Sequence, residues 1–279
     1  MAHQSTRRGA AFYLLALFFA LFVAFLYGPM LIIFLLSFQG PTGGLTFPMR
    51  GVSTHWFIDL WASSRYGDLG GAFWRSVLLG VLSMLITAVC CLFAGLAFRR
   101  RFWGAGPLFY LSIISLVIPG ILLGLGISQL FQLLGFRLHW WLSALGAHLS
   151  WTLPFGLLIM FAVLNRFDAT WEEAARDAGA RPSQILASIT VPILFPGLIA
   201  VALFGFTLSY DELPRSLLTV GGSNTLPIEI SNMTTNVTTP ALYAIGTVTS
   251  AVSFLVITAA FVAIAVIQKS RARARGGKA

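Results

Sequence analysis

Charged residues are scarce in this chain. They make up 10% of its 279 residues, whereas hydrophobic residues make up 57%, and the mean hydropathy is +0.85. A water-soluble globular protein has no use for that much apolar surface and is excluded. A helix that crosses a bilayer takes about 20 apolar residues, so the chain has room for about five to seven spans and none for a large soluble domain. Residues 1–279 are therefore predicted to form a single membrane domain.

Residue patterns that carry out chemistry are also missing. The two cysteines, Cys90 and Cys91, are adjacent in an apolar run, where neighbouring helix residues point in different directions. They form neither a metal motif nor a disulfide framework. The chain has no phosphate-binding Gly-x-x-x-x-Gly-Lys-Ser/Thr loop and no Ser/His/Asp or His/Glu zinc spacing. We predict no catalytic residue, no metal site and no cofactor bound by this chain; if ATP is used, it binds to another polypeptide. A membrane-embedded enzyme would need such a constellation.

Basic residues outnumber acidic ones by 18 to 9, which gives a net charge of +9 and a pI near 10.4. In a soluble chain this excess would indicate a nucleic-acid partner. Here it follows the topology: with six spans and both termini inside, thirteen basic residues lie on inner segments and five on outer ones. The positive-inside rule accounts for this asymmetry. We predict cytoplasmic termini, a surrounding lipid bilayer and no nucleic acid. The outer residues are Arg50, Arg65, Arg75, Arg137 and Arg215.

Apolar blocks alternate with polar segments along the chain. The third block contains Pro119-Gly120, and one broken span fits it better than two. Residues 39–73 are predicted to lie on the outer surface, residues 165–192 to form a cytoplasmic loop, and residues 214–239 to be polar and irregular. The six predicted spans are 10–38, 74–97, 107–134, 142–164, 193–213 and 241–268.

The cytoplasmic loop has signals for two short helices joined by an elbow. Thr170 followed by Glu173 matches a capping box, which predicts a helix that begins at Thr170. Gly179 suits the left-handed residue just past a helix end, and Pro182 suits the first turn of the next helix. The segment is therefore predicted to fold as helix, elbow, helix.

The first of these helices has the composition of a docking surface. Ala174, Ala175 and Ala178 give it a nearly bare flank, which lets the backbone of another protein approach closely. Four charged residues would fix the orientation of that partner: Glu172, Glu173, Arg176 and Asp177. A solvated amphipathic loop with no partner would explain the charges but not the placement of the glycine and the proline.

At these residues the chain resembles a known family. The cytoplasmic-loop signature of ABC importer permeases is Glu-Ala-Ala, three residues, Gly, nine residues, Ile-x-Leu-Pro, and the only departure here is a valine for the leucine. A second stretch, residues 206–212, is similar to the branch that contains the second permease of the spermidine/putrescine importers, as is Thr225-Leu226-Pro227. The matching segments of the signature are Glu173-Ala174-Ala175, Gly179 and Ile189-x-Val191-Pro192.

The resemblance implies a fold and a set of partners. The fold would be all-α, with six transmembrane helices in the type I ABC importer permease arrangement and a cytoplasmic coupling helix. The chain would lie in a bacterial inner membrane and pair with a second homologous permease. Two ATPase subunits, which hold ATP and Mg²⁺, would dock on its cytoplasmic side, and an extracytoplasmic solute-binding protein would deliver the solute. The residues that would couple it to the ATPase are Glu172, Glu173, Ala174, Ala175 and Gly179.

Two carboxylates near the end of the fifth predicted span are candidates for the solute path. A carboxylate near hydrocarbon is costly unless it faces a water-filled cavity or a partner, so Asp211 and Glu212 define a functional hypothesis, and Tyr210 is assigned with them. The alternative is that the two carboxylates reach the outer interface or pair with Arg215. On a path they would attract a cationic solute such as spermidine or putrescine.

The identity of the solute is less constrained than the fold. Polyamine permeases often carry a carboxylate after the proline of the third span, whereas this chain has Pro119-Gly120-Ile121. An amino-acid-like solute, an opine, a phosphonate or an anion is the alternative. A self-contained secondary transporter would need ionisable groups at mid-membrane and internal repeats, and inspection finds neither. His148, inside the fourth predicted span, is interpreted as a helix-to-helix hydrogen bonder and not as a proton relay.

Overall fold

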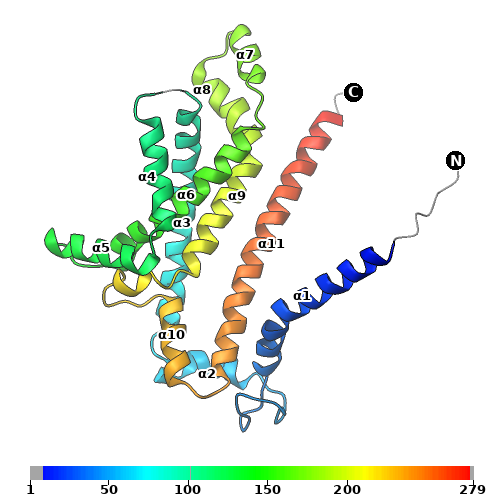
Figure 1. Cartoon of the computed structure of the whole chain (residues 1–279), viewed down its shortest axis with the longest axis vertical. Helices are drawn as coiled ribbons and strands as arrows, with labels where there is room; N and C mark the ends of the chain where they lie inside the picture. The colour runs from blue at the N-terminus through cyan, green and yellow to red at the C-terminus, as the bar shows by residue number, and fades with distance from the viewer. Residues whose placement is uncertain (1–8, 101, 277–279) are drawn as a thin grey trace. The chain divides into compact units, whose positions relative to one another are not determined.

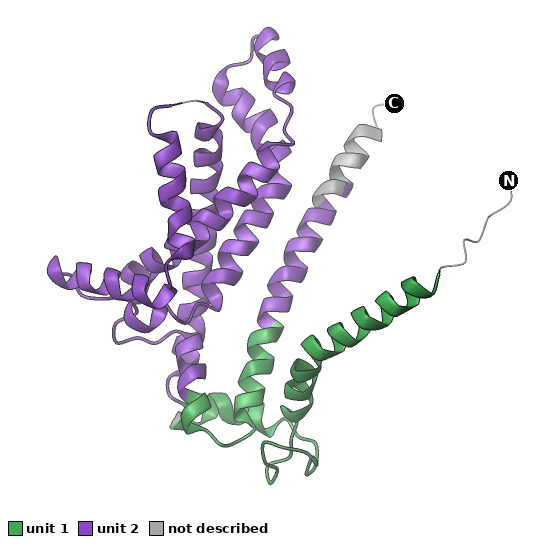
Figure 2. Cartoon of the chain, in the orientation of Figure 1, with its two compact units in different colours: residues 1–66, 233–251 green, residues 67–232, 252–279 purple. Residues whose placement is uncertain are grey.

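The computed structural model describes residues 9–100 and 102–276 of the chain (Figure 1). Over these residues the backbone is helical, apart from loops and one isolated bridge between Gln39 and Val52. The chain divides into two compact units, Met1–Tyr66 with Met233–Ala251, and Gly67–Asn232 with Val252–Ala279 (Figure 2). Four of the basic residues assigned to the inner side, Arg7, Arg8, Arg101 and Lys278, lie outside the described residues, as do both termini.

The first unit joins one long apolar helix to a polar loop. The buried side chain of Gln39 organises this loop, because its Oε1 accepts the Arg50 N–H at 2.7 Å and its Nε2 donates to the Gly44 carbonyl at 3.2 Å. The Tyr243 hydroxyl donates to the Leu45 carbonyl at 2.7 Å and ties the loop to the last helix. The helices of this unit are α1 (Ala10–Leu36), α2 (His55–Ala62), η1 (Ser64–Tyr66) and the start of α11 (Ala241–Gly276).

The second unit contains the remaining helices. It also holds most of α10 (Leu226–Asn236) and the later part of α11. Its other elements are α3 (Leu69–Phe98), α4 (Ala105–Val117), α5 (Gly120–Leu133), the π-turn η2 (Trp140–Ala144), α6 (Leu145–Leu164), α7 (Thr170–Asp177), α8 (Pro182–Ile185), the π-turn η3 (Leu186–Thr190), α9 (Val191–Tyr210) and η4 (Ser216–Leu218).

The core of the second unit lies where α3, α6 and α9 pack against one another. A small residue allows this close approach: a Cβ on Gly156 would lie 2.7 Å from the Thr87 methyl and 2.8 Å from Cys91 Sγ. The Thr87 and Thr152 hydroxyls share a hydrogen bond of 2.9 Å between α3 and α6. Both features are typical of helix packing in membranes, where small residues and interhelical hydrogen bonds replace the hydrophobic driving force.

Five described helices are long and apolar enough to span a membrane, and there are up to six if α4 and α5 form one span. The predicted break in the third block is present, but the bend is 112°, far more than a kink. Ile118 has extended backbone angles before Pro119, as residues that precede proline prefer, and α5 starts at Gly120. The block is therefore two helices joined at a sharp corner.

Several element boundaries differ from the sequence prediction. The helix of the second span begins at Leu69, because the Asp68 carboxylate accepts the Gly71 N–H and caps it. The helix of the fifth span begins at Pro182 and runs through η3 to Tyr210, short of the predicted end. Residues 214–239, predicted to be irregular, contain η4 and α10, and the Ser76 hydroxyl accepts the Leu226 N–H at the start of α10.

Candidate functional site: a helical elbow and a buried ion pair

The elbow between α7 and α8 has the geometry that its sequence predicts. Gly179 has φ +80°, the left-handed conformation that glycine adopts without steric cost, and α8 begins at Pro182. The Gly179 N–H donates to the Arg176 carbonyl at 2.8 Å, and the Ala180 N–H donates to the Ala175 carbonyl at 3.0 Å. These two bonds satisfy the last carbonyls of α7 and fix the direction in which the chain leaves it.

The predicted capping box at the start of α7 is wrong. Thr170 already lies within the helix and its side chain does not cap it; instead Asp168 Oδ1 accepts the Thr170 N–H at 3.0 Å. This hydrogen bond holds the pKa of the Asp168 carboxyl below its usual value. Asp168, just before the helix, thus accepts the N–H that the capping box assigned to the Glu173 carboxylate. Glu173 is exposed to solvent. Ala174 is also exposed and Ala175 is half-buried.

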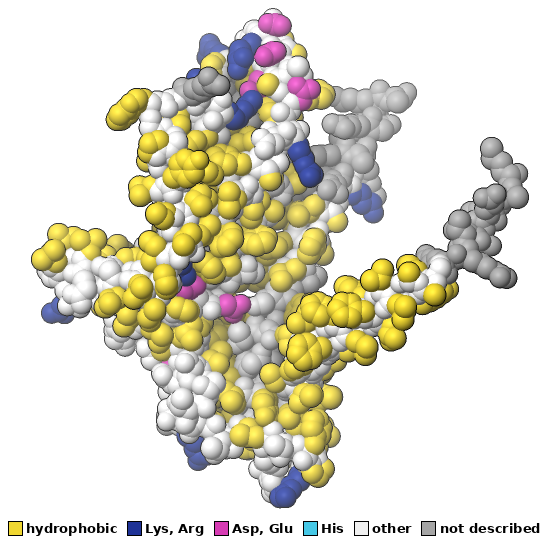
Figure 3. All heavy atoms as spheres, in the orientation of Figure 1, with side chains coloured by type: hydrophobic (Ala, Val, Ile, Leu, Met, Phe, Trp, Pro, Cys, Tyr) yellow, Lys and Arg dark blue, Asp and Glu magenta, His cyan; other side chains and the backbone are white. Residues whose placement is uncertain are grey.

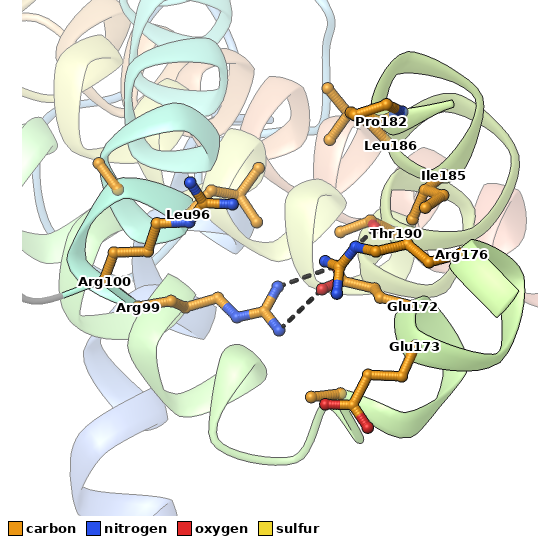
Figure 4. A pocket seen from close by; sticks show the side chains of 12 residues that line it. Leu96, Arg99, Arg100, Glu172, Glu173, Arg176, Pro182, Ile185, Leu186 and Thr190 are labelled. Carbon is orange, nitrogen blue, oxygen red and sulfur yellow. Dashed lines mark hydrogen bonds and ion pairs between the residues drawn. The ribbon is translucent and has the colours of Figure 1, made fainter. Parts of the chain in front are cut away.

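Glu172, in contrast, turns inward and joins three elements (Figure 4). Its carboxylate accepts two hydrogen bonds from the Arg99 guanidinium, at 2.9 and 3.1 Å, and a third from the Thr190 hydroxyl at 2.8 Å. Arg99 caps the end of α3 and also stacks over the Phe167 ring at 4.9 Å. Burial raises the pKa of Glu172, but the bonds from Arg99 and Thr190 and the Arg99 charge outweigh it, so the pKa is lowered. The carboxylate is therefore ionised at neutral pH.

A cavity of about 560 Å³ lies beside this bridge, between the end of α3 and the α7–α8 elbow (Figure 4). Its charged lining consists of Arg99, Arg100, Arg176, Glu172 and Glu173. Many charged side chains of the second unit gather over α7, α8 and the end of α3, whereas the flank of the helices beyond them is mainly apolar (Figure 3). A charged end of this kind suits contact with a water-soluble partner.

The three predicted solute-path residues are consecutive in the chain but differ in their exposure to solvent. Only Asp211 is exposed, whereas Glu212 is 5% exposed and Tyr210 is 1% exposed. Tyr210 stacks on Phe206 with 5.6 Å between the ring centroids. Glu212 Oε1 accepts hydrogen bonds from the Arg215 backbone N–H at 3.0 Å and from Arg215 Nη1 at 3.2 Å. The pairing of Glu212 with Arg215 that the sequence allowed as an alternative is therefore the one observed.

Arg215 sits in a space that glycines of α5 leave open. A Cβ on Gly120 would lie 2.9 Å from Arg215 Nη1, and a Cβ on Gly124 would lie 2.9 Å from the Arg215 carbonyl oxygen. The guanidinium also stacks over the Trp151 ring of α6, 4.7 Å from its centroid. Sequence reasoning placed Arg215 in an outer loop, because nothing local indicates that it is 5% exposed at the corner between α4 and α5.

His148 is a helix-to-helix hydrogen bonder, as the sequence interpretation favoured. Its Nδ1 lies 2.7 Å from the Ser209 hydroxyl and its Nε2 lies 2.8 Å from the Ser216 hydroxyl. Both ring nitrogens are thus engaged by serines on other elements, and the side chain is buried. Among the described residues, no group of three or more His, Cys, Asp or Glu side chains is placed to hold a metal ion.

Known proteins match both the sequence and the fold. Residues 88–273 match the family described as binding-protein-dependent transport system inner membrane component. The spermidine/putrescine transport system permease protein PotC of Shigella flexneri is 29% identical over 256 residues, 91% of this chain and 93% of the relative. The PotC protein of Escherichia coli K12 is 30% identical, with coverage of 85% and 88%. The putrescine transport system permease protein PotI of Escherichia coli K12 is 28% identical, with 80% coverage of each chain.

Solved structures support the fold in particular. A chain of a bacterial alginate ABC transporter, in complex with a periplasmic protein that carries an alginate pentasaccharide, superposes with a TM-score of 0.66 over 90% of this chain and 92% of that chain, at 14% identity. A chain of the inward-facing MetNI methionine ABC transporter gives a TM-score of 0.57 over 71% and 95%, at 18% identity. The predicted all-α, type I ABC importer permease fold is confirmed. The chain thus belongs to the family of binding-protein-dependent transport system inner membrane components, the membrane-embedded permease subunits of ABC importers.

Proposed function

We propose that this chain is one of two membrane subunits of an ATP-driven importer of polyamines such as spermidine and putrescine. The observation that carries the proposal is its similarity, over most of both chains, to permeases named for spermidine/putrescine and putrescine transport. ATP and Mg²⁺ bind to two partner ATPase subunits on the cytoplasmic side. A second permease completes the path, and an extracytoplasmic binding protein delivers the solute. Both termini of this chain lie in the cytoplasm.

In this proposal the exposed side of α7 receives the movement of the ATPase. Glu173, Ala174 and Gly179 are accessible at the elbow, and the small side chains leave room for a foreign backbone. Closure of the ATPase subunits around ATP then displaces α7, and the displacement moves the α3, α6 and α9 core between inward-open and outward-open arrangements. The experiment is uptake of radiolabelled spermidine into liposomes that contain the complete complex with trapped ATP. Uptake by this chain alone without nucleotide would contradict the proposal and favour a secondary transporter.

The solute-path prediction narrows to one carboxylate. Glu212 is neutralised by Arg215, so Asp211 is the one exposed carboxylate of the predicted set and the group that attracts the solute ammonium. Asp211→Asn is expected to raise the KM for spermidine uptake about tenfold, because a charge-assisted hydrogen bond is weakened to a neutral one. Asp211→Glu keeps the charge and is expected to stay near the wild-type KM. Equal KM values for the Asn variant and the wild type would remove Asp211 from the path.

A further inference from the structure

The two adjacent glutamates of α7 have different surroundings. Successive helix residues point about 100° apart, so Glu172 and Glu173 leave α7 in different directions. Glu173 is exposed, whereas the Glu172 side chain has 13% of its surface exposed and accepts three hydrogen bonds from this chain itself. Little of the Glu172 carboxylate is therefore accessible for hydrogen bonds to a second protein. The sequence alone groups Glu172 with the residues that would contact the ATPase.

The partners of Glu172 lie at the end of α3 and in η3, the turn that leads into α9. Arg99 caps α3, and its guanidinium binds the carboxylate through two parallel N–H···O bonds, which fix direction as well as distance. Thr190 is 1% exposed and ends the π-turn η3, from which α9 continues at Val191. Bulges of this kind occur often at functional positions in helices. A single carboxylate thus connects α7 to the ends of α3 and α9, which pack on each other.

We propose that the Arg99–Glu172–Thr190 cluster is the internal linkage that transmits displacement of α7 to α3 and α9. Arg99 and Glu172 are positioning residues for transport, and contact with the ATPase is left to Glu173 and the exposed alanines. This inference rests on the proposed coupling to an ATPase. It assigns to Arg99 a role that its place just after the second predicted span does not indicate. The stacking of Arg99 on Phe167 steadies the same guanidinium from the α6–α7 connection.

Coupling is tested in the complete complex by three measurements: co-purification of the ATPase, ATP hydrolysis, and solute taken up per ATP hydrolysed. Arg99→Gln and Glu172→Gln are each expected to keep the first two and to lower the third by about tenfold, within the range of coupling free energies between sites. Arg99→Lys keeps the charge without the parallel bonds and should fall between Arg99→Gln and the wild type. The matched control is Arg100→Gln, which removes a neighbouring guanidinium that lines the same cavity.

Two further variants separate linkage from folding and from ATPase contact. The exchange of charges in Arg99→Glu with Glu172→Arg should recover part of the lost coupling, and Thr190→Val should weaken coupling without removing a charge. Loss of ATPase co-purification in Glu172→Gln would overturn the proposal, since Glu172 would then be a contact residue. Unchanged uptake per ATP in Arg99→Gln would overturn it as well.

A solute-independent measurement distinguishes failure of the linkage from failure of the proposed function. Spin labels at Asp177 of α7 and Phe93 of α3, both exposed, report the distance between these helices once Cys90 and Cys91 are replaced by alanine. With the linkage intact, the distance distribution is expected to be narrow and the same with and without ATP, because α7 and α3 move together. In Arg99→Gln it should broaden or shift when ATP is added. Identical distributions in the two proteins would contradict the linkage, whatever solute the complex transports.

Discussion

Arg215→Met is expected to yield a permease that unfolds on the order of 10 °C below the wild type in detergent. Glu212 is 5% exposed, and the substitution leaves its carboxylate buried without its guanidinium partner. Removal of one partner of a buried pair costs about 3–5 kcal/mol. The variant also loses the stacking on Trp151 and leaves the space beside Gly120 unfilled. Thermal unfolding followed by size-exclusion chromatography measures the shift.

The matched control for this prediction is Arg137→Met, because Arg137 is exposed. It should unfold at nearly the wild-type temperature. The double variant Glu212→Met with Arg215→Met should recover part of the loss, since replacement of a whole buried pair by apolar side chains is often neutral. If Arg215→Met and Arg137→Met unfold at the same temperature, the buried pair does not hold the corner between α4 and α5.

Gly179→Val is expected to uncouple ATP hydrolysis from transport while the protein still inserts into the membrane. The elbow holds this residue at φ +80°, which a β-branched side chain adopts only with strain of about 1–3 kcal/mol. Nothing lies within 4 Å of a Cβ added there, so the effect is on the backbone of the elbow and not on core packing. Solute uptake per ATP hydrolysed should fall about tenfold, which is within the usual range of coupling between sites.

Two control variants test whether the loss of coupling comes from backbone strain at the elbow itself. Gly179→Asn should retain most of the coupling, because asparagine tolerates the left-handed conformation. Gly104→Val places the same strain at φ +88° in the connection before α4, also with open space around the added Cβ. If Gly104→Val and Gly179→Val reduce uptake equally, the elbow has no special role in coupling.

The short-range features of the chain follow from its sequence. Gly179 and Pro182 predict the elbow because a left-handed residue and a first-turn proline are local requirements of the backbone. The break at Pro119 follows for the same reason, and apolar length predicts a protein that crosses the membrane several times. The capping box failed although it too is local, because Asp168 accepts the Thr170 N–H that the Glu173 carboxylate would have accepted, and the Glu173 N–H donates to the Ala169 carbonyl.

The long-range pairings were decided by the tertiary structure alone. Glu172 and Glu173 are equivalent in sequence, and only the approach of α3 and η3 assigns one to Arg99 and Thr190 and leaves the other exposed. The Glu212–Arg215 pair is local, three residues apart, and the sequence offered it as an alternative; what the fold decides is its burial beside Gly120 and Gly124 of α5. The sequence by itself determines that this is a multi-span membrane protein with a helix–elbow–helix segment, because apolar length and turn geometry are local. Some charged side chains are exposed and others form ion pairs and hydrogen bonds within the chain. This division depends on contacts between distant residues, which only the packing of the helices decides.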